Sequence, residues 1–272
     1  MGEALNRRSF LGMAAGAAAL GAMSLAGCAP SASNDATPLA SAGVPESWDH
    51  EADFVVVGAG TALTGALKAV EQGMSAIVIE ARAIAGGTTA LSGGSVWIPC
   101  NDYAKDDRAA AKTYMTKVAD GLSTEAIIDA YLDNASPMIN FITEQTGVAW
   151  EIADRTDYHE QWEGATTATR TVKPIDPETG KSTNGGGYTQ PQADKFTELG
   201  GTILFNTTAE TLVARTLDDG RQEVLGVIAT DAKGATLAIK ASKAVLLGAG
   251  GFDYNDDMKA QYLDIPSPCT FM

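Results

Sequence analysis

The sequence has few of the residues that build metal centres and few positive charges. Its 272 residues include two histidines (His50 and His159) and three cysteines (Cys28, Cys100 and Cys269), and no pair has the spacing of metal ligands. Lys and Arg number 19 against 34 Asp and Glu, so the formal net charge is −15. We therefore expect no bound metal and no nucleic-acid partner. An anionic ligand is compatible with this charge, because backbone N–H groups bind phosphate without Lys or Arg.

The sequence also lacks an apolar run long enough to form a stable membrane span. The longest run, residues 11–27, is short and rich in Ala and Gly, as in the apolar part of a signal peptide. It overlaps Arg7-Arg8-Ser9-Phe10-Leu11, which resembles the twin-arginine signal that exports folded proteins. The N-terminus is therefore interpreted as an export signal.

The end of this run, Leu25-Ala26-Gly27-Cys28, resembles a bacterial lipobox, in which the Cys receives a lipid. We expect residues 1–28 to be a twin-arginine and lipoprotein signal. The mature protein would then lie outside the cytoplasm, anchored to the membrane through Cys28. The alternative for Cys28 is an ordinary small residue near a signal-peptidase cut. Residues 29–50 are rich in Ser, Ala and Pro and are predicted to be a flexible linker.

From residue 53 onward the spacing of apolar residues predicts an α/β fold in a single domain, residues 51–272. Short apolar runs predict buried strands at 54–57, 76–79 and 244–247. Helical spacing predicts helices at 61–72, 106–119, 124–146 and 188–199. Residues 202–239 are predicted to form a strand and then an antiparallel meander, and residues 153–188 a loop.

A glycine-rich corner joins the first two predicted strands. Gly58-Ala59-Gly60 lies between a strand and a helix, and Glu80 ends the second strand about twenty residues later. In dinucleotide-binding folds such glycines let a pyrophosphate approach the backbone at the helix N-terminus, and the acidic residue accepts hydrogen bonds from ribose hydroxyls. The alternative for Gly58 and Gly60 is a plain turn between a strand and a helix, and the alternative for Glu80 is a solvated strand end.

Three segments together resemble one family of flavoproteins. They are Asp53-Phe-Val-Val-Val-Gly-Ala-Gly60, Gly86-Gly-Thr-Thr-Ala-Leu-Ser-Gly-Gly-Ser-Val-Trp-Ile-Pro99 and Lys243-Ala-Val-Leu-Leu-Gly-Ala-Gly-Gly-Phe252. They are similar to the flavoprotein subunits of fumarate reductase and succinate dehydrogenase, the 3-ketosteroid dehydrogenases and the urocanate reductases. The resemblance implies FAD as cofactor and a Rossmann-like FAD-binding domain with a parallel sheet and an antiparallel β-meander. It also implies that the chain ends near the start of a cap domain, which is largely missing.

The resemblance further implies a role for each residue of the cofactor site. The pyrophosphate, the adenosine ribose, the ribityl chain, the isoalloxazine ring and the adenine would each meet a different group of residues. These are Gly58, Ala59 and Gly60 at the pyrophosphate; Glu80, Ala81 and Arg82 at the ribose; Gly87, Thr88 and Thr89 at phosphate and ribityl oxygens; Ser92, Gly93 and Gly94 along the ring; Ala209 at the adenine; and Ala249 and Gly250 closing over the cofactor. The alternative for residues 86–94 is a flexible surface loop.

The sequence departs from the family's Gly-x-Gly-x-x-Gly pattern at Leu63, which occupies the place of the third Gly. That Gly normally lets the helix pack closely on the sheet, so a Leu would crowd this contact. Two outcomes are open. Either the corner is defective, or the turn re-forms one residue later.

No catalytic residue can be assigned from the sequence. Tyr103, His159 and Arg170 are candidates by residue type only and are otherwise interpreted as surface residues. Cys100, next to Pro99, is interpreted as a packing residue rather than a flavin attachment site.

The resemblance predicts an FAD-dependent oxidoreductase that moves a hydride between flavin and an activated carbon–carbon bond. Its substrate would be a small carboxylate or ketone, and a separate C-terminal half or an electron-donor protein would be its partner. One alternative is a flavin-binding fragment without turnover. Another is a chain that cannot hold FAD and exposes an apolar sheet edge prone to aggregation.

Overall fold

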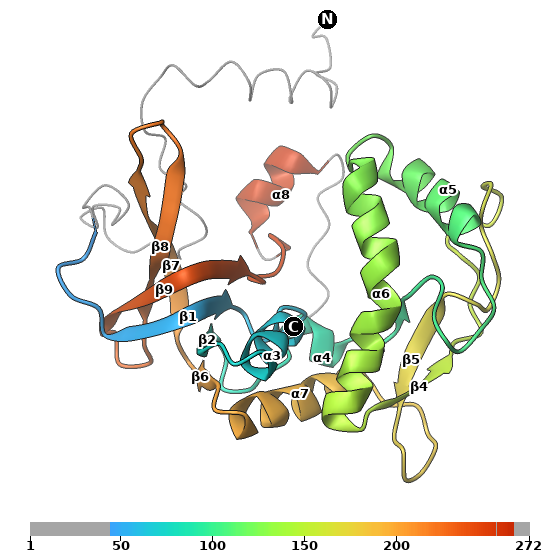
Figure 1. Cartoon of the computed structure of the whole chain (residues 1–272), viewed down its shortest axis with the longest axis horizontal. Coiled ribbons are helices and arrows are strands. Elements are labelled where there is room, and N and C mark those ends of the chain that lie inside the picture. The colour runs from blue at the N-terminus through green and yellow to red at the C-terminus, as the bar shows by residue number, and fades with distance from the viewer. Residues whose placement is uncertain (1–43, 254, 264–272) are drawn as a thin grey trace, which may run out of the picture.

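The computed structural model describes residues 44–253 and 255–263, which form two β-sheets and six helices of an α/β fold (Figure 1). In chain order the elements are β1 (His50–Val57), α3 (Leu63–Glu71), β2 (Ala76–Ile79), α4 (Gly87–Leu91), β3 (Val96–Trp97), α5 (Arg108–Ala119), α6 (Glu125–Thr146), β4 (Ala149–Ile152), β5 (Thr171–Ile175), α7 (Gly186–Glu198), β6 (Thr202–Leu204), β7 (Thr208–Thr216), β8 (Gln222–Thr230), β9 (Thr236–Leu247) and α8 (Asp256–Tyr262). The predicted signal and most of the predicted linker, including Cys28, lie outside the described residues.

The larger sheet has the order β6-β2-β1-β9-β8-β7. Strands β6, β2, β1 and β9 run parallel, and β9, β8 and β7 form the antiparallel meander, as the sequence predicted. The centre of β1 is buried on both faces: Val56 packs with the cluster that includes Leu67 of α3 and Phe196 of α7, and Val55 packs with Ile239 on the other face. This two-sided burial explains the unbroken apolar runs of the parallel strands.

Strand β9 corrects two predictions. Residues 236–239 and 244–247, predicted as separate strands, form one continuous strand. Strand β8 pairs with β9 only as far as Lys240, whereas β1 pairs with it to Leu247. Among the described residues no strand covers the other side of residues 242–247, and Leu247 is 59% exposed. The carboxyl end of β9 is therefore an open apolar edge rather than a buried strand.

The smaller sheet, β3-β5-β4, was not predicted. Its middle strand contains Pro174, inside the segment predicted as a loop. Strand β3 pairs only with Thr171 and Val172, so Pro174 lies beyond it, where one side of β5 has no strand partner and a missing N–H is tolerated. Trp150 of β4 and Ile139 of α6 pack with Val172, which fixes the long helix on this sheet.

The helix predictions were correct apart from their ends. Asp107 caps α5 by accepting N–H groups of Ala109 and Ala110, and Thr124 caps α6. Helix α6 runs alongside the smaller sheet, with α5 beside its upper half (Figure 1). No helix of residues 44–253 and 255–263 has the length and apolarity needed to cross a membrane.

The folded domain begins before residue 51, its predicted start. Asp49, in the segment predicted to be a flexible linker, already contacts the larger sheet, since its N–H donates to the Ala238 carbonyl oxygen.

Candidate functional site

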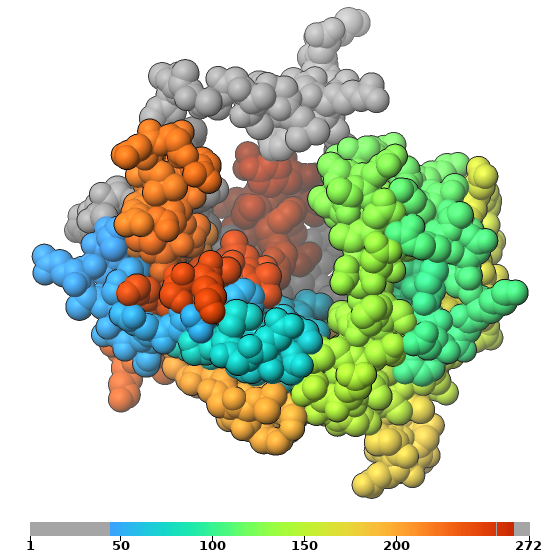
Figure 2. Space-filling view, viewed as in Figure 1, coloured from blue at the N-terminus to red at the C-terminus, as the bar shows by residue number. Residues whose placement is uncertain are grey.

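A cavity of about 370 Å³ lies at the carboxyl ends of β1, β2 and β9, and we call it the strand-end cavity. This is the usual ligand position in an open α/β sheet. The space-filling view shows the surface hollowed between β9 and α6 (Figure 2). Most of the predicted cofactor residues line the cavity, namely Gly58, Gly60, Glu80, Ala81, Arg82, Gly87, Thr88, Thr89, Ala209, Ala249 and Gly250.

The carboxylate of Glu80 lies directly at the glycine corner. Its Oε2 accepts the Ala59 N–H at 2.8 Å and its Oε1 accepts the Arg82 N–H at 2.8 Å. Glu80 is 6% exposed and lines the cavity, whereas Ala59 is fully buried behind it. A carboxylate has about four lone-pair positions, so two amides leave capacity for ribose hydroxyls. The two amides therefore orient the Glu80 carboxylate and leave it able to accept further hydrogen bonds.

The backbone at Gly58 explains why glycine is needed there. Its φ of 93° is unfavourable for other residues, and a Cβ at this position would lie 2.3 Å from the Gly248 carbonyl oxygen. The close approach of these two strand ends forms the floor of the cavity. Gly60 and Thr61 lie just before α3, which has neither a side-chain cap nor an acidic residue in its first turn. An uncapped helix start facing a cavity suits an anion such as a diphosphate.

The helix start has re-formed around Leu63. The Leu63 N–H donates to the Gly60 carbonyl oxygen, and the Leu63 side chain is fully buried in the core. The helix approaches the sheet closely at two other glycines. A Cβ on Gly65 would lie 2.9 Å from Leu246 Cδ2, and a Cβ on Gly248 would lie 2.3 Å from the Ala62 Cβ. Two other glycines therefore provide the room that the third Gly of the pattern normally provides, and the corner is intact.

Residues 86–94 are tied to the fold rather than forming a loose loop. The Ser92 carbonyl oxygen accepts the Gly185 N–H, and the Ser92 hydroxyl donates to the Thr89 carbonyl oxygen. A Cβ on Gly94 would lie 2.9 Å from the backbone of residues 184 and 185. Ser92, Gly93 and Gly94 do not line the strand-end cavity, so their position along a flavin ring stays a prediction.

The sequence missed part of the cavity wall. Thr207, Thr208, Gly251 and Asp253 line it, beside the predicted Ala209, Ala249 and Gly250. The Thr207 N–H donates to the Glu80 carbonyl oxygen, which places the start of β7 against the end of β2. Nothing in the sequence around these residues marks this contact.

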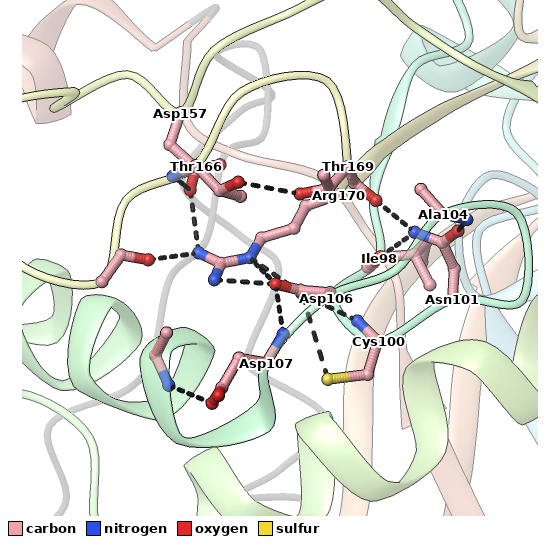
Figure 3. A network of polar contacts seen from close by, with 12 residues as sticks. Ile98, Cys100, Asn101, Ala104, Asp106, Asp107, Asp157, Thr166, Thr169 and Arg170 are labelled. Carbon is pink, nitrogen blue, oxygen red and sulfur yellow. Dashed lines mark hydrogen bonds and ion pairs between the residues drawn. The ribbon is translucent and has the colours of Figure 1, made fainter.

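Arg170 was wrongly interpreted as a surface residue. Its side chain is 1% exposed and forms ion pairs with Asp106 at 2.9 Å and with Asp157 at 2.9 Å (Figure 3). Burial alone would raise the pKa of Asp106, but hydrogen bonds from Arg170 and from the Cys100 and Asp107 amides hold it below its usual value. A guanidinium occupied in this way is a structural cation and is not free to bind a substrate.

The other candidates do not gather into a catalytic group. Tyr103 is 39% exposed, and His159 stacks on Trp162 at 3.9 Å between ring centroids. Burial, together with the Asp106 carboxylate, raises the pKa of the Cys100 thiol, so the thiol is a poor nucleophile at neutral pH. Among residues 44–253 and 255–263, no three His, Cys, Asp or Glu side chains come together as metal ligands.

Comparison with known proteins gives a single family. A family model described as FAD binding domain matches residues 53–268. The 3-oxosteroid 1-dehydrogenase of Comamonas testosteroni is 29% identical over 287 residues, covering 80% of this chain and 50% of that protein. The urocanate reductase of Eggerthella lenta is 30% identical over 230 residues, covering 80% and 34%. The chain spans about half the length of the steroid dehydrogenases that it matches.

Solved structures agree with this comparison. The 3-ketosteroid delta1-dehydrogenase from Sterolibacterium denitrificans, in complex with 1,4-androstadiene-3,17-dione, superposes with a TM-score of 0.73 at 25% identity, covering 80% of this chain and 51% of that one. A flavocytochrome c3 fumarate reductase superposes with a TM-score of 0.66 at 21% identity, covering 79% and 36%. The second likeness concerns the fold alone.

Proposed function

The chain belongs to the FAD binding domain family of flavoprotein oxidoreductases, with FAD as its cofactor, and we propose that it serves hydride transfer between flavin and an activated carbon–carbon bond. The substrate would be a small ketone or carboxylate that withdraws electrons from that bond. FAD supplies the hydride-transfer chemistry when bound. The chain's own residues bind and orient it.

One observation carries this proposal: a buried carboxylate and an uncapped helix start meet in the same cavity. Glu80 would accept the hydroxyls of the adenosine ribose, and the amides around Gly60 would face the diphosphate. The wall formed by Gly87, Thr88 and Thr89 would continue along the ribityl chain. No step of the reaction is assigned to a side chain.

An absorbance titration with FAD tests the cofactor site. We expect a saturable change in the flavin spectrum when the purified chain is added. Glu80→Gln should weaken FAD binding about ten- to a hundredfold, since a hydrogen bond to a charged group is worth about 1.5–3 kcal/mol. The same variant should bind FMN as well as the unmodified chain does, because FMN has no adenosine ribose. An equal loss of affinity for FAD and for FMN would show that Glu80 does not bind the adenosine ribose.

A flavin-binding fragment without turnover is the second candidate function. The open edge at residues 242–247 of β9 favours it. Assays with a 3-ketosteroid, fumarate or urocanate would separate the two. FAD binding with no reaction supports the fragment, and turnover supports the enzyme. A colourless chain that takes up no FAD would defeat both as claims about this chain alone.

We also propose that the protein is exported and lipid-anchored. Arg7-Arg8 and the segment that ends at Cys28 support this proposal. Replacing Cys28 by Ala should move the protein from the membrane fraction to the soluble fraction. Unchanged membrane partition would reject the lipid anchor.

A further inference from the structure

Helix α7 packs against the two helices that adjoin the strand-end cavity, α3 and α4 (Figure 1). Gly60 and Thr61, which lead into α3, would face the diphosphate, and we call them the diphosphate wall. Residues 87–89, which lie in α4, would face the ribityl chain, and we call them the ribityl wall. Because FAD would extend along both, the distance between the two walls decides how well it fits.

The first turn of α7 is in direct contact with the segment that carries the ribityl wall. The Gly185 N–H donates to the Ser92 carbonyl oxygen at 3.0 Å. A Cβ on Gly185 would lie 1.8 Å from the Thr89 carbonyl oxygen, and a Cβ on Gly86 would lie 2.9 Å from the Thr189 hydroxyl oxygen. A shift of this turn along the helix axis would therefore displace the ribityl wall.

A buried side-chain contact joins α7 to α3. The Thr64 hydroxyl donates to the Gln192 side-chain oxygen at 2.8 Å. The Gln192 side-chain nitrogen donates to the carbonyl oxygen of Tyr188, in the first turn of α7, at 2.9 Å. Because this carbonyl can only accept, it fixes which end of the amide faces Thr64. Gln192 thus connects α3 to the turn that holds the ribityl wall.

Stability alone does not explain a polar pair at this position. Gln192 is 1% exposed, and its neighbours Ala193 and Phe196 belong to the core cluster that includes the apolar face of α3. Replacing a buried hydrogen-bonded pair by apolar groups of the same shape can be neutral for stability. Apolar cores of the right volume lose uniqueness before they lose stability, whereas a satisfied polar pair specifies one arrangement. The pair therefore suits a role in fixing how α7 lies on α3.

We propose that Gln192 is a positioning residue of the cofactor site, which sets the spacing of the two walls through Thr64 and the first turn of α7. The inference rests on the proposed function, because FAD is the ligand that would span both walls. ADP ends at the diphosphate wall and has no ribityl chain. Misaligned walls should therefore weaken FAD binding and leave ADP binding nearly unchanged.

Substitution of Thr64 tests the proposal, with FAD and ADP titrated into the full chain by isothermal titration calorimetry. Thr64→Val keeps the shape and removes the hydroxyl. If aligned walls are then populated about a tenth of the time, FAD affinity falls about tenfold, while ADP affinity changes by less than about twofold. Thr64→Ser keeps the hydroxyl and should bind FAD as the unmodified chain does. Equal losses for FAD and ADP, or equal FAD affinity in the Val and Ser variants, would overturn the proposal.

Gln192→Met removes the amide and keeps an apolar side chain of similar length. Its FAD affinity should fall as in Thr64→Val, and the double variant should show no further loss, because both changes remove the same contact. Thr197→Val is the matched control, since the Thr197 hydroxyl donates to the Ala193 carbonyl oxygen within α7. A loss of FAD affinity in this control equal to that in Thr64→Val would reject the proposal, as would additive losses in the double variant.

Hydrogen exchange without FAD distinguishes this proposal from the proposed function. In Thr64→Val the amides of residues 86–92 and 185–189 should exchange faster than in the unmodified chain, while those of β8 should not change. Unchanged exchange at residues 86–92 would reject the positioning role, whatever the affinity for FAD. Faster exchange in a chain that takes up no FAD even when unmodified would reject the proposed function and support the link between the walls. Circular dichroism checks that each variant is folded.

Discussion

The strand-end cavity is walled mainly by small residues, with glycines at its strand ends, whereas a second cavity of about 620 Å³, between α5, α6 and residues 155–159, is walled by side chains held in place by buried ion pairs. We call this second cavity the aromatic cavity, after its mainly aromatic and apolar lining. At Gly58 the two strand ends approach so closely that a Cβ would lie 2.3 Å from a carbonyl oxygen. At Trp97 the ring is fixed through Asp157 to Arg170. The first kind of site depends on the absence of side chains, and the second on a chain of specific contacts. They should therefore respond to different substitutions.

The largest effect is expected where the helix behind the strand-end cavity departs from the glycine pattern. Leu63→Gly restores the pattern but removes a fully buried side chain. Truncating a buried Leu to Ala costs about 2–5 kcal/mol, and Gly in a helix adds about 1 kcal/mol. We expect the free energy of unfolding in urea to fall by about 3–6 kcal/mol. An unchanged or higher stability would mean that Gly65 and Gly248 have not replaced the third Gly.

The next largest effect tests the aromatic cavity. Arg170→Met leaves Asp106 and Asp157 buried without their cation, and breaking a buried ion pair costs about 3–5 kcal/mol. Urea unfolding should show this loss, and the near-UV circular dichroism of Trp97 should weaken. The matched control is Arg215→Gln, whose exposed pair with Glu223 is worth about 1 kcal/mol or less. Similar losses in the two variants would show that the buried cluster does not hold the wall.

The same contrast explains which parts of the fold could be predicted. The apolar runs at β1 and β2 and the capped helices α5 and α6 were correct, because their signals lie within a few consecutive residues. The smaller sheet was missed because Pro174 reads as a loop signal, and only the partner strands show that it is tolerated there. The continuity of β9 was missed because two neighbours share it: β8 pairs with its first part, as far as Lys240, and β1 pairs with it from Ile239 to Leu247.

The candidate sites divide in the same way. Gly58 and Glu80 were predicted because a dinucleotide corner requires glycines and an acidic residue at fixed spacings, and Gly250 because residues 243–252 resemble the flavoprotein family. Trp97 and Tyr131 were not, because they come from separate elements that only the tertiary fold brings together. Arg170 was misread because residue type says nothing about carboxylates 13 and 64 positions away.

A smaller effect is expected for alanine at two glycines with positive φ. Gly58 has a φ of 93° and lies against Gly248, whereas Gly73 has a φ of 80° and open space around its Cα. Gly73→Ala should cost about 1 kcal/mol of strain, and Gly58→Ala about 1–3 kcal/mol together with the loss of FAD binding. Thermal unfolding and the FAD titration measure the two quantities. Normal FAD binding by Gly58→Ala would separate the glycine corner from the cofactor site.

The smallest effect concerns acid pH and again separates the two regions. The fold holds the pKa of Asp106 below its usual 3.8, because hydrogen bonds from Arg170 and two amides outweigh the effect of burial. A carboxyl whose pKa is lowered by folding stabilises the protein fully above its unfolded value, and this contribution is lost as the pH falls through the lower folded value. The stability difference between the unmodified chain and Asp106→Asn should thus be constant near neutral pH and shrink below about pH 3.8. Asp133→Asn, at an exposed pair with Arg108, provides the control with a small difference throughout. If Asp106→Asn behaves like this control, the carboxylate behind the aromatic wall does not carry the stability assigned to it, and NMR titration of its carboxyl carbon would then show an ordinary pKa.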